Sequence, residues 1–470
     1  MDSGIALVGV FSLAVAYVTL RQRSSIQNIP GPPSPSWIFG NMLQLILPGE
    51  YGANEFAWLK AFGAVYRLKG CFGTACSFRI ILRYSIFSIA LSSHMDPLKK
   101  TGIDLIFAEK CVMAQQGDTH KRLRAALNPC FTGAAVRNFL PIFEKVAQAM
   151  TAKFEESSGS EVDVCPVFSE ATLSTISEAA LGYPMQDLNK DFVAYNERLL
   201  ALAVNLSPGQ ILSDAISVRL PRWILKAAIH LPLTTFHIIR TAKALAKELG
   251  GKIIREKIDV ARQGSVAETD VFDMLLDLGN PEKKKNALTL DEIVDQTGIL
   301  LVGGQDTTSN TLAFGLLELA RHPTFQDELR VEIHSAIGAA SGTPVYDNMP
   351  LLNAFIKETL RVYPVGAFEE RIATQDTVIP LAYEIQTTTG KIINQIPVSK
   401  GQVLHVAIAS YQRLESHWGE DAHKFRPSRW LDGTVYQGQA IGPYANLLTF
   451  FGGPRACLGY ANPEALQCYS

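Results

Sequence analysis

Residues 450–459 read FFGGPRACLG, and this stretch decides the fold because it sets one cysteine in a loop rich in glycine and proline. Glycines in such a loop let backbone N–H groups approach the sulfur and share its negative charge, and an arginine can reach an acidic porphyrin edge. The stretch therefore predicts a thiolate ligand of haem iron. The alternative is a buried free cysteine beside a turn. The positions that fit the pattern F-x-x-G-x-R-x-C-x-G, and that we predict to form the haem loop, are Phe450, Gly453, Arg455, Cys457 and Gly459.

The composition favours one large folded unit. The chain has 470 residues, of which 47% are hydrophobic and 19% charged, a composition that argues against disorder. Its net charge of -2 gives no electrostatic case for nucleic-acid binding. Its seven cysteines are scattered and include no C-x-x-C pair, which argues against a disulfide framework or a zinc site.

The dominant periodicity is helical. Apolar residues recur at three- and four-residue spacing, with charges between them, in Phe139–Glu156, Asp191–Val204 and Thr235–Arg262. Strand-like segments are few and lie at 65–68 and, separated by turn residues, between 378 and 408. We expect a mainly α protein with small β-sheets.

The longest predicted helix runs from about Leu290 to His322, before Pro323, and would span roughly 50 Å. Its middle, GGQDTTS at 303–309, sets two glycines beside an acid and three hydroxyl residues. Such a conflict within a well-patterned helix is expected at functional sites, and small residues such as Gly303 permit close approach of a flat cofactor. The alternative is a kinked core helix with no chemical role.

With these features the chain resembles the cytochrome P450 family of haem-thiolate monooxygenases, and in particular its membrane-anchored fungal members. The resemblance implies the cytochrome P450 fold in a single large domain at residues 41–470. It makes Thr307 the oxygen-side hydroxyl and Asp306 its acidic partner in proton delivery. It also places Glu358, Arg361 and Arg429 in a buried ion network that supports the cysteine loop.

Further basic residues are expected at the haem. His120 and Arg124 are four apart on a predicted helix and could both face the haem propionates, as the matching family helix does. A solvated basic turn is the alternative. Lys121 and Arg122, on another side, could meet an acidic electron donor. Arg371 lies where the family has another propionate-binding arginine.

The first residues indicate a membrane anchor. Gly4 to Leu20 is an uncharged, largely apolar run, and Arg21 and Arg23 follow it. This charge order favours an uncleaved anchor at residues 1–23 over a signal peptide, and it predicts a cytosolic protein body. The proline-rich residues 24–40 are predicted to form a stiff hinge.

Two segments depart from the family pattern. Asn462-Pro463 follows the cysteine loop closely and the sequence ends at Ser470, so we expect a C-terminally truncated domain. The resemblance also fades from Thr74 to Lys100. Both segments have the character of misread exon boundaries or of an alternative transcript.

The resemblance implies a monooxygenase anchored by a single pass in the endoplasmic reticulum membrane. It would hold haem b, accept electrons from NADPH through a cytochrome P450 reductase, and insert one atom of dioxygen into an apolar organic substrate. Three alternatives stay open: a haem-thiolate isomerase or dehydratase, a haem-based sensor, and a catalytically silent, truncated protein of the same fold that retains haem poorly.

Overall fold

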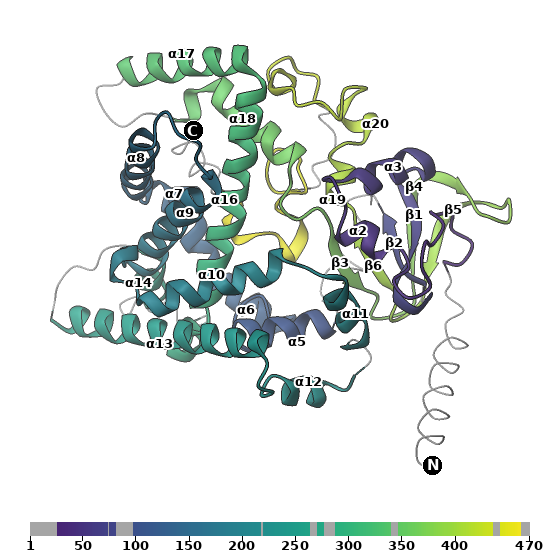
Figure 1. Cartoon of the computed structure of the whole chain (residues 1–470), viewed down its shortest axis with the longest axis horizontal. Coiled ribbons are helices and arrows are strands. Elements are labelled where there is room, and N and C mark those ends of the chain that lie inside the picture. Colours follow the sequence, from purple (N-terminus) through teal and green to yellow (C-terminus); the bar gives the residue numbers. More distant parts are fainter. Residues whose placement is uncertain are drawn as a thin grey trace. The chain divides into compact units, whose positions relative to one another are not determined.

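The computed structural model describes residues 26–73, 75–80, 97–217, 220–263, 270–276, 287–339, 346–435 and 442–461 (Figure 1). The chain divides into two compact units. The first comprises residues 1–96, 206–219 and 367–411, and the second comprises residues 97–205, 220–366 and 412–470.

The first unit holds both sheets. One sheet has four strands in the order β1-β2-β6-β3, in which β2 pairs antiparallel with β1 and parallel with β6. Strands β4 and β5 form a separate antiparallel pair. Leu45, Trp58, Tyr66 and Leu68 form a buried cluster between the small helices and β1. The elements of this unit are α2 (Met42–Ile46), α3 (Ala53–Phe62), β1 (Val65–Lys69), β2 (Ala75–Ile80), α11 (Pro208–Ser217), β3 (Glu369–Ile372), β4 (Thr377–Gln386), β5 (Ile392–Val398), β6 (Val403–Val406) and α19 (Ile408–Tyr411).

The second unit is helical among its described residues. Its main elements are α5 (Pro97–Ile106), α6 (Gly117–Leu127), α7 (Gly133–Arg137), α8 (Leu140–Glu156), α9 (Val164–Leu181), α10 (Lys190–Val204), α12 (Arg222–Ala228), α13 (Thr234–Arg262), α14 (Val271–Leu276), α15 (Leu290–Val294), α16 (Thr297–Arg321), α17 (Pro323–Ala339), α18 (Pro350–Val362) and α20 (Glu415–Trp418). Short 3₁₀ turns near its end are η6 (Pro427–Trp430), η7 (Gly453–Arg455) and η8 (Leu458–Ala461).

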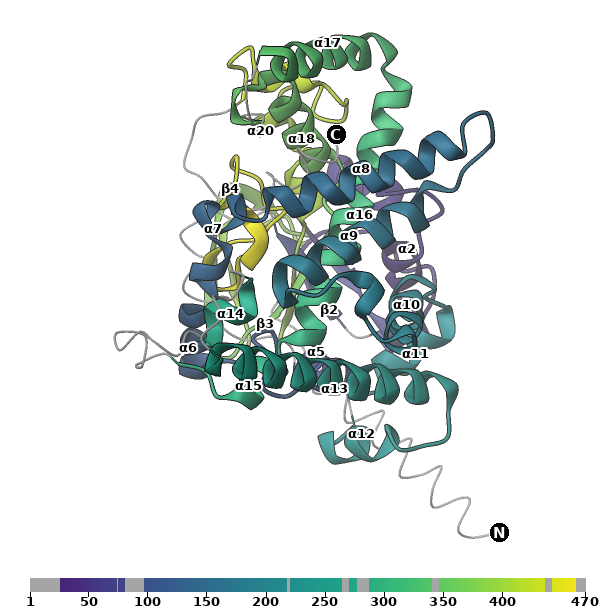
Figure 2. The same ribbon diagram turned by 90° about the vertical axis from the view of Figure 1, so that its left-hand side faces the viewer.

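Helix α16 is central to the packing of the second unit. It lies beside α9 in both views, and α13 also packs against it (Figures 1 and 2). Buried residues on α13 recur at helical spacing, for example Ala242, Ala246, Leu249 and Ile253. This apolar stripe is what the sequence periodicity predicts for a helix that covers a core on one face.

The predicted fold class, mainly α with small sheets, is confirmed. Three predicted helices match α8, α10 and α13 to within one residue at each end. Strand β2 was not predicted, and it lies inside the segment from Thr74 to Lys100 that departs from the family pattern. Its pairing with β6, more than three hundred residues away, is the kind of contact that local patterning does not show.

The prediction of one helix from Leu290 to His322 is wrong at its beginning. The helix is interrupted at Asp295 and Gln296, between α15 and α16. The Gln296 side chain is fully buried and donates to the carbonyl of Glu292 at 2.6 Å, while its Oε1 accepts from the N–H of Val112 at 2.8 Å. Thr297 Oγ1 also donates to the carbonyl of Val294 at 2.8 Å. Side chains thus take over carbonyls that a continuous helix would use.

Several sequence predictions fall outside the described residues: the anchor at residues 1–23, the first two residues of the hinge, Thr74 and residues 81–96 of the atypical segment, and residues 462–470. The described part of the hinge packs on β1, where the carbonyl of Pro30 accepts from the N–H of Arg67 at 2.8 Å. Within the described part of the chain, no single helix combines the length and hydropathy of a membrane span, and α10 and α11 do so only when taken together.

Candidate functional site

The cysteine loop is closed by its own backbone. The N–H of Cys457 donates to the carbonyl of Phe450 at 2.9 Å, and the N–H of Ala456 donates to the carbonyl of Gly453 at 3.1 Å. Gly453 has a φ of +66° and Phe451 one of +58°, so the loop turns twice through the left-handed region. Such a conformation is strained for phenylalanine and natural for glycine. The result is a tight loop that presents Cys457 at its end.

The Cys457 side chain reaches solvent, although many protein atoms surround it. These surroundings raise the pKa of the Cys457 thiol, whereas the N–H of Gly459 and the charge of Arg124 act to lower it. The N–H of Gly459 therefore faces the sulfur, as expected for a loop that shares a thiolate's charge. Leu458, the next residue, packs on Leu123 and Leu127 of α6 and fixes the loop to that helix.

Helix α6 brings basic side chains to this loop. Arg124 Nη1 donates to the carbonyl of Ala456 at 2.8 Å, and Arg455 Nη2 donates to the carbonyl of Gln115 at 2.6 Å. His120 is buried, and burial together with the charges of Arg455 and Arg124 lowers its pKa to about 4. His120 is therefore neutral at physiological pH and can donate a hydrogen bond but not a charge. The structure thus gathers His120, Arg124, Arg455 and Cys457.

Other basic residues have different partners. Arg371 is on β3 of the first unit, where it donates to Glu369 Oε2 at 3.1 Å and to the carbonyl of Glu370 at 2.7 Å. Its role toward the haem stays a prediction. Arg122 pairs with Glu292, an arrangement that raises the Arg122 pKa, so its guanidinium is already engaged.

Helix α16 presents two different faces at its polar segment. Leu301, Gln305 and Ser309 are buried, whereas Gly303 and Thr307 are exposed. A Cβ at Gly303 would meet no atom within 4 Å, but one at Gly304 would lie 2.5 Å from Ile176 Cγ1 of α9. Gly304 therefore permits the close contact of two helices, while Gly303 leaves one face of α16 open to a flat ligand.

The predicted proton-handling pair lies on this segment. Thr307 Oγ1 donates to the carbonyl of Gly303 at 2.8 Å, which leaves its oxygen free to accept. Burial raises the pKa of the Asp306 carboxyl, and Asn310 Nδ2, which donates to Asp306 Oδ1 at 3.1 Å, acts to lower it. Asp306 is thus held by Asn310, a residue that the sequence did not indicate.

Glu358, Arg361 and Arg429 come together in the interior. Glu358 Oε1 accepts from Arg361 Nη2 at 2.8 Å and from Arg429 Nε at 2.9 Å, and all three side chains are at most 1% exposed. Trp430 Nε1 also donates to Glu358 Oε2, at 3.0 Å. Arg361 Nε also donates to Glu358 Oε2, at 2.9 Å. The other guanidinium donors bond carbonyls, including that of Gln412 at 2.6 Å from Arg361 Nη1, and the Asp421 carboxylate, at 3.1 Å from Arg429 Nη1. Buried charges persist only with such pairing.

Gln412 is a residue of this network that the sequence did not reveal. Its Nε2 donates to the carbonyls of Leu360 and Arg361, at 3.0 and 2.8 Å. Its Oε1 accepts from the N–H of Leu448 at 2.9 Å and from Thr449 Oγ1 at 3.0 Å. Gln412 therefore ties the end of α18 to the residues directly before Phe450. No local pattern marks it, because all four partners lie far away in the sequence.

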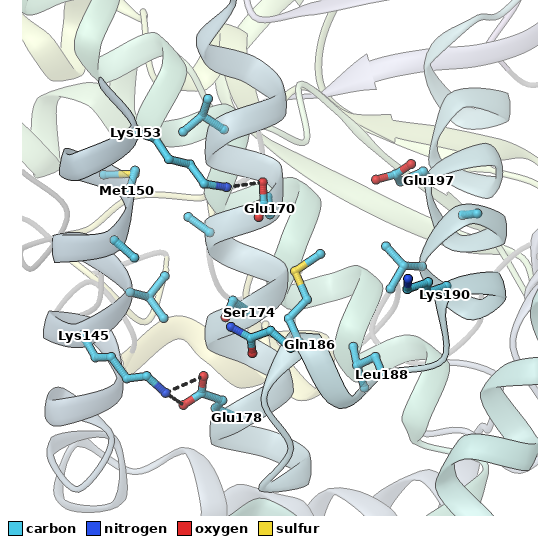
Figure 3. A pocket seen from close by; sticks show the side chains of 17 residues that line it. Lys145, Met150, Lys153, Glu170, Ser174, Glu178, Gln186, Leu188, Lys190 and Glu197 are labelled. Carbon is cyan, nitrogen blue, oxygen red and sulfur yellow. Dashed lines mark hydrogen bonds and ion pairs between the residues drawn. The ribbon is translucent and has the colours of Figure 1, made fainter. Parts of the chain in front are cut away.

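A separate groove of about 490 Å³ lies between α8, α9 and α10 (Figure 3). Apolar side chains such as Met150 and Leu188 line it. Lys145 pairs with Glu178 at 2.9 Å and Lys153 with Glu170 at 2.6 Å at its sides. None of the predicted site residues lines this groove.

The residues of the second unit fit a haem group. A cysteine with a backbone N–H directed at its sulfur is suited to bind iron as a thiolate, and the guanidinium groups of Arg124 and Arg455 beside the loop suit the propionates. Gly303 leaves one helix face clear for a flat ring.

The comparisons with known proteins agree with this assignment. The model of the family described as cytochrome P450 matches residues 30–461. The chain is 30% identical to cytochrome P450 monooxygenase 219 of Postia placenta over 504 residues, which covers 98% of this chain and 90% of that protein. It is 25% identical to a ganoderic acid synthetase of Ganoderma lucidum, with 98% of this chain and 89% of that protein covered.

Solved structures support the same fold. The structure resembles the haem domain of cytochrome P450DA with a TM-score of 0.69 at 20% identity, covering 94% of this chain and 89% of that one. It also resembles a retinoic acid-bound cyanobacterial CYP120A1, with a TM-score of 0.67 at 22% identity and coverage of 94% and 91%.

Proposed function

Because this chain belongs to the cytochrome P450 family, and is therefore a haem-thiolate monooxygenase that uses dioxygen and a redox partner, we propose that Cys457 would hold the iron of haem b. We also propose that the substrate is an apolar organic molecule. We further propose that electrons come from NADPH through a cytochrome P450 reductase. The observation that carries the assignment of the ligand is the closed loop in which the N–H of Gly459 faces the Cys457 sulfur.

Haem bound through a thiolate supplies the activation of dioxygen, because that ligand donates electron density to iron and favours O–O cleavage. The protein residues hold and supply protons. Asp306 has a raised pKa, so it retains its proton nearer to neutral pH than an ordinary carboxyl group does. Thr307 accepts at its oxygen because its proton is already donated to Gly303. Together they can orient a water and pass a proton through it.

We propose that Arg124 and Arg455 bind the haem propionates, with neutral His120 as an additional hydrogen-bond donor. For Arg371 the proposal of a propionate contact rests on the family resemblance alone. Charge-assisted bonds from arginine to carboxylate are short and strong, and burial of the site strengthens them. The buried network of Glu358, Arg361 and Arg429 acts on the cysteine loop through Gln412. It has a structural role and does not touch the substrate.

We also propose that residues 1–23 anchor the protein in the endoplasmic reticulum membrane, with the catalytic units in the cytosol. The support is the apolar run from Gly4 to Leu20 and the arginines that follow it. The membrane-anchored monooxygenases that this chain resembles have the same arrangement.

The test is the spectrum of the reduced, carbonyl-bound protein in detergent. We expect a thiolate-type Soret band for the wild-type protein and its loss in Cys457→Ala. Unchanged pigment and product yield in Cys457→Ala would contradict the assignment. NADPH consumption with added reductase, absent without it, tests the electron source and separates a monooxygenase from a haem-based sensor.

A further inference from the structure

Three helices of the second unit are joined by a chain of three polar side chains, of which Asn196 and Gln305 are buried. Asn196 of α10 donates through Nδ2 to Gln305 Oε1 of α16 at 2.7 Å. Gln305 in turn donates through Nε2 to Ser169 Oγ of α9 at 2.9 Å. Asn196 is 3% exposed and Gln305 is 1% exposed, so water cannot replace either partner without a rearrangement. The chain therefore fixes the three helices relative to one another.

Helix α9 holds Gln305 at a second point. Thr172 Oγ1 donates to the backbone carbonyl of Gln305 at 3.0 Å as well as to the carbonyl of Phe168 at 2.8 Å. Ser169 and Thr172 are three residues apart and share one face of α9. Both the side chain and the peptide group of Gln305 are thus held from outside α16, beside the close contact between Gly304 and Ile176.

Gln305 directly precedes the proton-handling pair Asp306 and Thr307. Residues 305 and 307 are separated by about 200° around a helix, so a bond that fixes Gln305 on the buried face also fixes where Thr307 points on the exposed face. A small rotation of α16 would move Thr307 and would break the bonds at Gln305. The orientation of Thr307 is therefore linked to these buried bonds.

The attachment of α10 to the core depends strongly on the hydrogen bond between Asn196 and Gln305. Only Phe192 and Asn196 of its fifteen residues are buried, and they are four apart on one face. Phe192 joins the apolar core, and Asn196 supplies the polar contact with α16. If α10 moved away, Gln305 Oε1 would lose its donor in the interior, which is unfavourable.

We propose that Asn196 and Gln305 are positioning residues for oxygen activation: their hydrogen bond couples the placement of α10 to the orientation of Asp306 and Thr307 in α16. This inference rests on the proposed function of those two residues. It adds a route by which whatever moves α10, such as a substrate that contacts it, changes proton delivery. Neither residue touches the reacting atoms in this proposal.

The test compares Asn196→Leu, Gln305→Leu and the double variant with the matched control Phe192→Leu. Phe192 lies one helical turn from Asn196 on the same face, so its substitution trims apolar packing while the bond between Asn196 and Gln305 still holds α10 in place against α16. The full-length protein with haem is reconstituted with reductase. We measure the carbonyl spectrum, the fraction of NADPH electrons recovered as hydrogen peroxide, and amide hydrogen exchange in peptides that cover residues 303–309.

We expect Asn196→Leu to keep the thiolate-type carbonyl band and to raise both the peroxide fraction and the exchange rate at residues 303–309 by about fivefold to tenfold, the change that one lost hydrogen bond produces. The Phe192→Leu control should raise exchange in α10 but not at residues 303–309. Gln305→Leu should reproduce the effect, and the double variant should show no more than the larger single effect, because both substitutions break the same bond.

Equal exchange and equal peroxide fractions in Asn196→Leu and Phe192→Leu would overturn the inference, as would additive effects in the double variant. The exchange measurement needs no turnover. If the wild-type protein shows no thiolate-type band, the proposed function fails. If the band is present and exchange at residues 303–309 is unchanged in Asn196→Leu, only the coupling fails.

Discussion

Gln412 allows a sharp test of how one residue supports the cysteine loop. Gln412→Leu removes an amide that serves four buried groups, of which the N–H of Leu448 and the hydroxyl of Thr449 lie next to the loop. Each buried group left without a partner costs about 1–3 kcal/mol, so we expect a loss of several kcal/mol in the free energy of unfolding and a lower haem content. Chemical unfolding and the pigment content per protein measure both. The control Gln395→Leu, on an exposed position of β5, should change stability by less than about 0.5 kcal/mol; an equally small effect of Gln412→Leu would contradict the prediction.

The raised pKa of the buried Asp270 carboxyl predicts that the stability of the protein depends on pH. Burial and the neighbouring carboxyl of Asp273 raise the pKa of Asp270 from 3.8 to about 7, although Lys257, which pairs with both carboxylates, acts to lower it. The folded protein therefore holds a proton that the unfolded chain releases above about pH 4. The stability contributed by this proton is fully present below the unfolded pKa and is lost as pH rises through 7.

Asp270→Asn removes this dependence while keeping the shape of the side chain. We expect the variant to gain about 1–3 kcal/mol relative to the wild-type protein between about pH 5 and about pH 8, because the amide has no proton to lose. Thermal or chemical unfolding of both proteins at the two pH values measures the difference. A difference in stability that is the same at both values would show that Asp270 does not titrate in this range.

At the residue scale, the sequence predicts residues that belong to a chemical motif and misses residues whose role depends on their packed surroundings. Cys457 stands in a pattern that few other functions need, and the family resemblance that this pattern supports adds Thr307 and Glu358. Gln305 and Gln412 make equally specific contacts, but these partners are 36 or more residues away in the sequence. A glutamine surrounded by ordinary residues gives no local sign of being buried, so only the structure identifies it.

Helices α9 and α16 provide a test of packing at the element scale. A Cβ at Gly304 would lie 2.5 Å from Ile176 Cγ1, so Gly304→Ala should force the two helices apart and cost about 1–3 kcal/mol in the free energy of unfolding. In the double variant with Ile176→Ala the loss should be smaller than the sum of the single losses, because the clash is relieved. Gly251→Ala in α13 is the control, since the nearest atom there is the flexible end of Arg255 at 3.4 Å. It should be neutral or stabilising by up to about 1 kcal/mol. Additive losses at Gly304 and Ile176 would contradict the packing argument.

At the element scale, hydrophobic periodicity predicts the boundaries of three helices but misses an interruption within a helical pattern. The helices that cover a core on one face were predicted nearly to the residue, because their apolar stripes are long and regular. The break between α15 and α16 was not, since the residues around Gln296 continue the helical pattern while its side chain bonds Val112 and Glu292. Helix α16 has 25 residues and spans about 38 Å, which is shorter than expected. Tertiary hydrogen bonds thus decided a boundary that local propensity left open.

The molecule as a whole depends on joining segments that are remote in sequence, and the network at Glu358 does this within the second unit. Glu358 and Arg361 come from α18, Arg429 from η6, and the carbonyls that complete the guanidinium shells come from residues 412–424. The sequence predicted the three charged residues through the family resemblance. The resemblance also predicted that they are buried together, but it could not show which carbonyls they bond.

Glu358→Gln should therefore affect the stability of the entire second unit. The substitution leaves Arg361 buried without its carboxylate partner and leaves Arg429 with Asp421, 3.1 Å away, as its remaining one. Removal of one partner from a buried ion pair costs about 3–5 kcal/mol. We expect loss of haem together with a lower unfolding midpoint, measured by pigment content and by the far-ultraviolet circular dichroism of the helices. Glu109→Gln is the matched control, because Glu109 forms an exposed pair with Lys226 at 2.9 Å and such pairs contribute at most about 1 kcal/mol. If Glu358→Gln lost haem but kept a wild-type unfolding midpoint, the network would act on the cofactor directly, and its assignment as a structural support would be wrong.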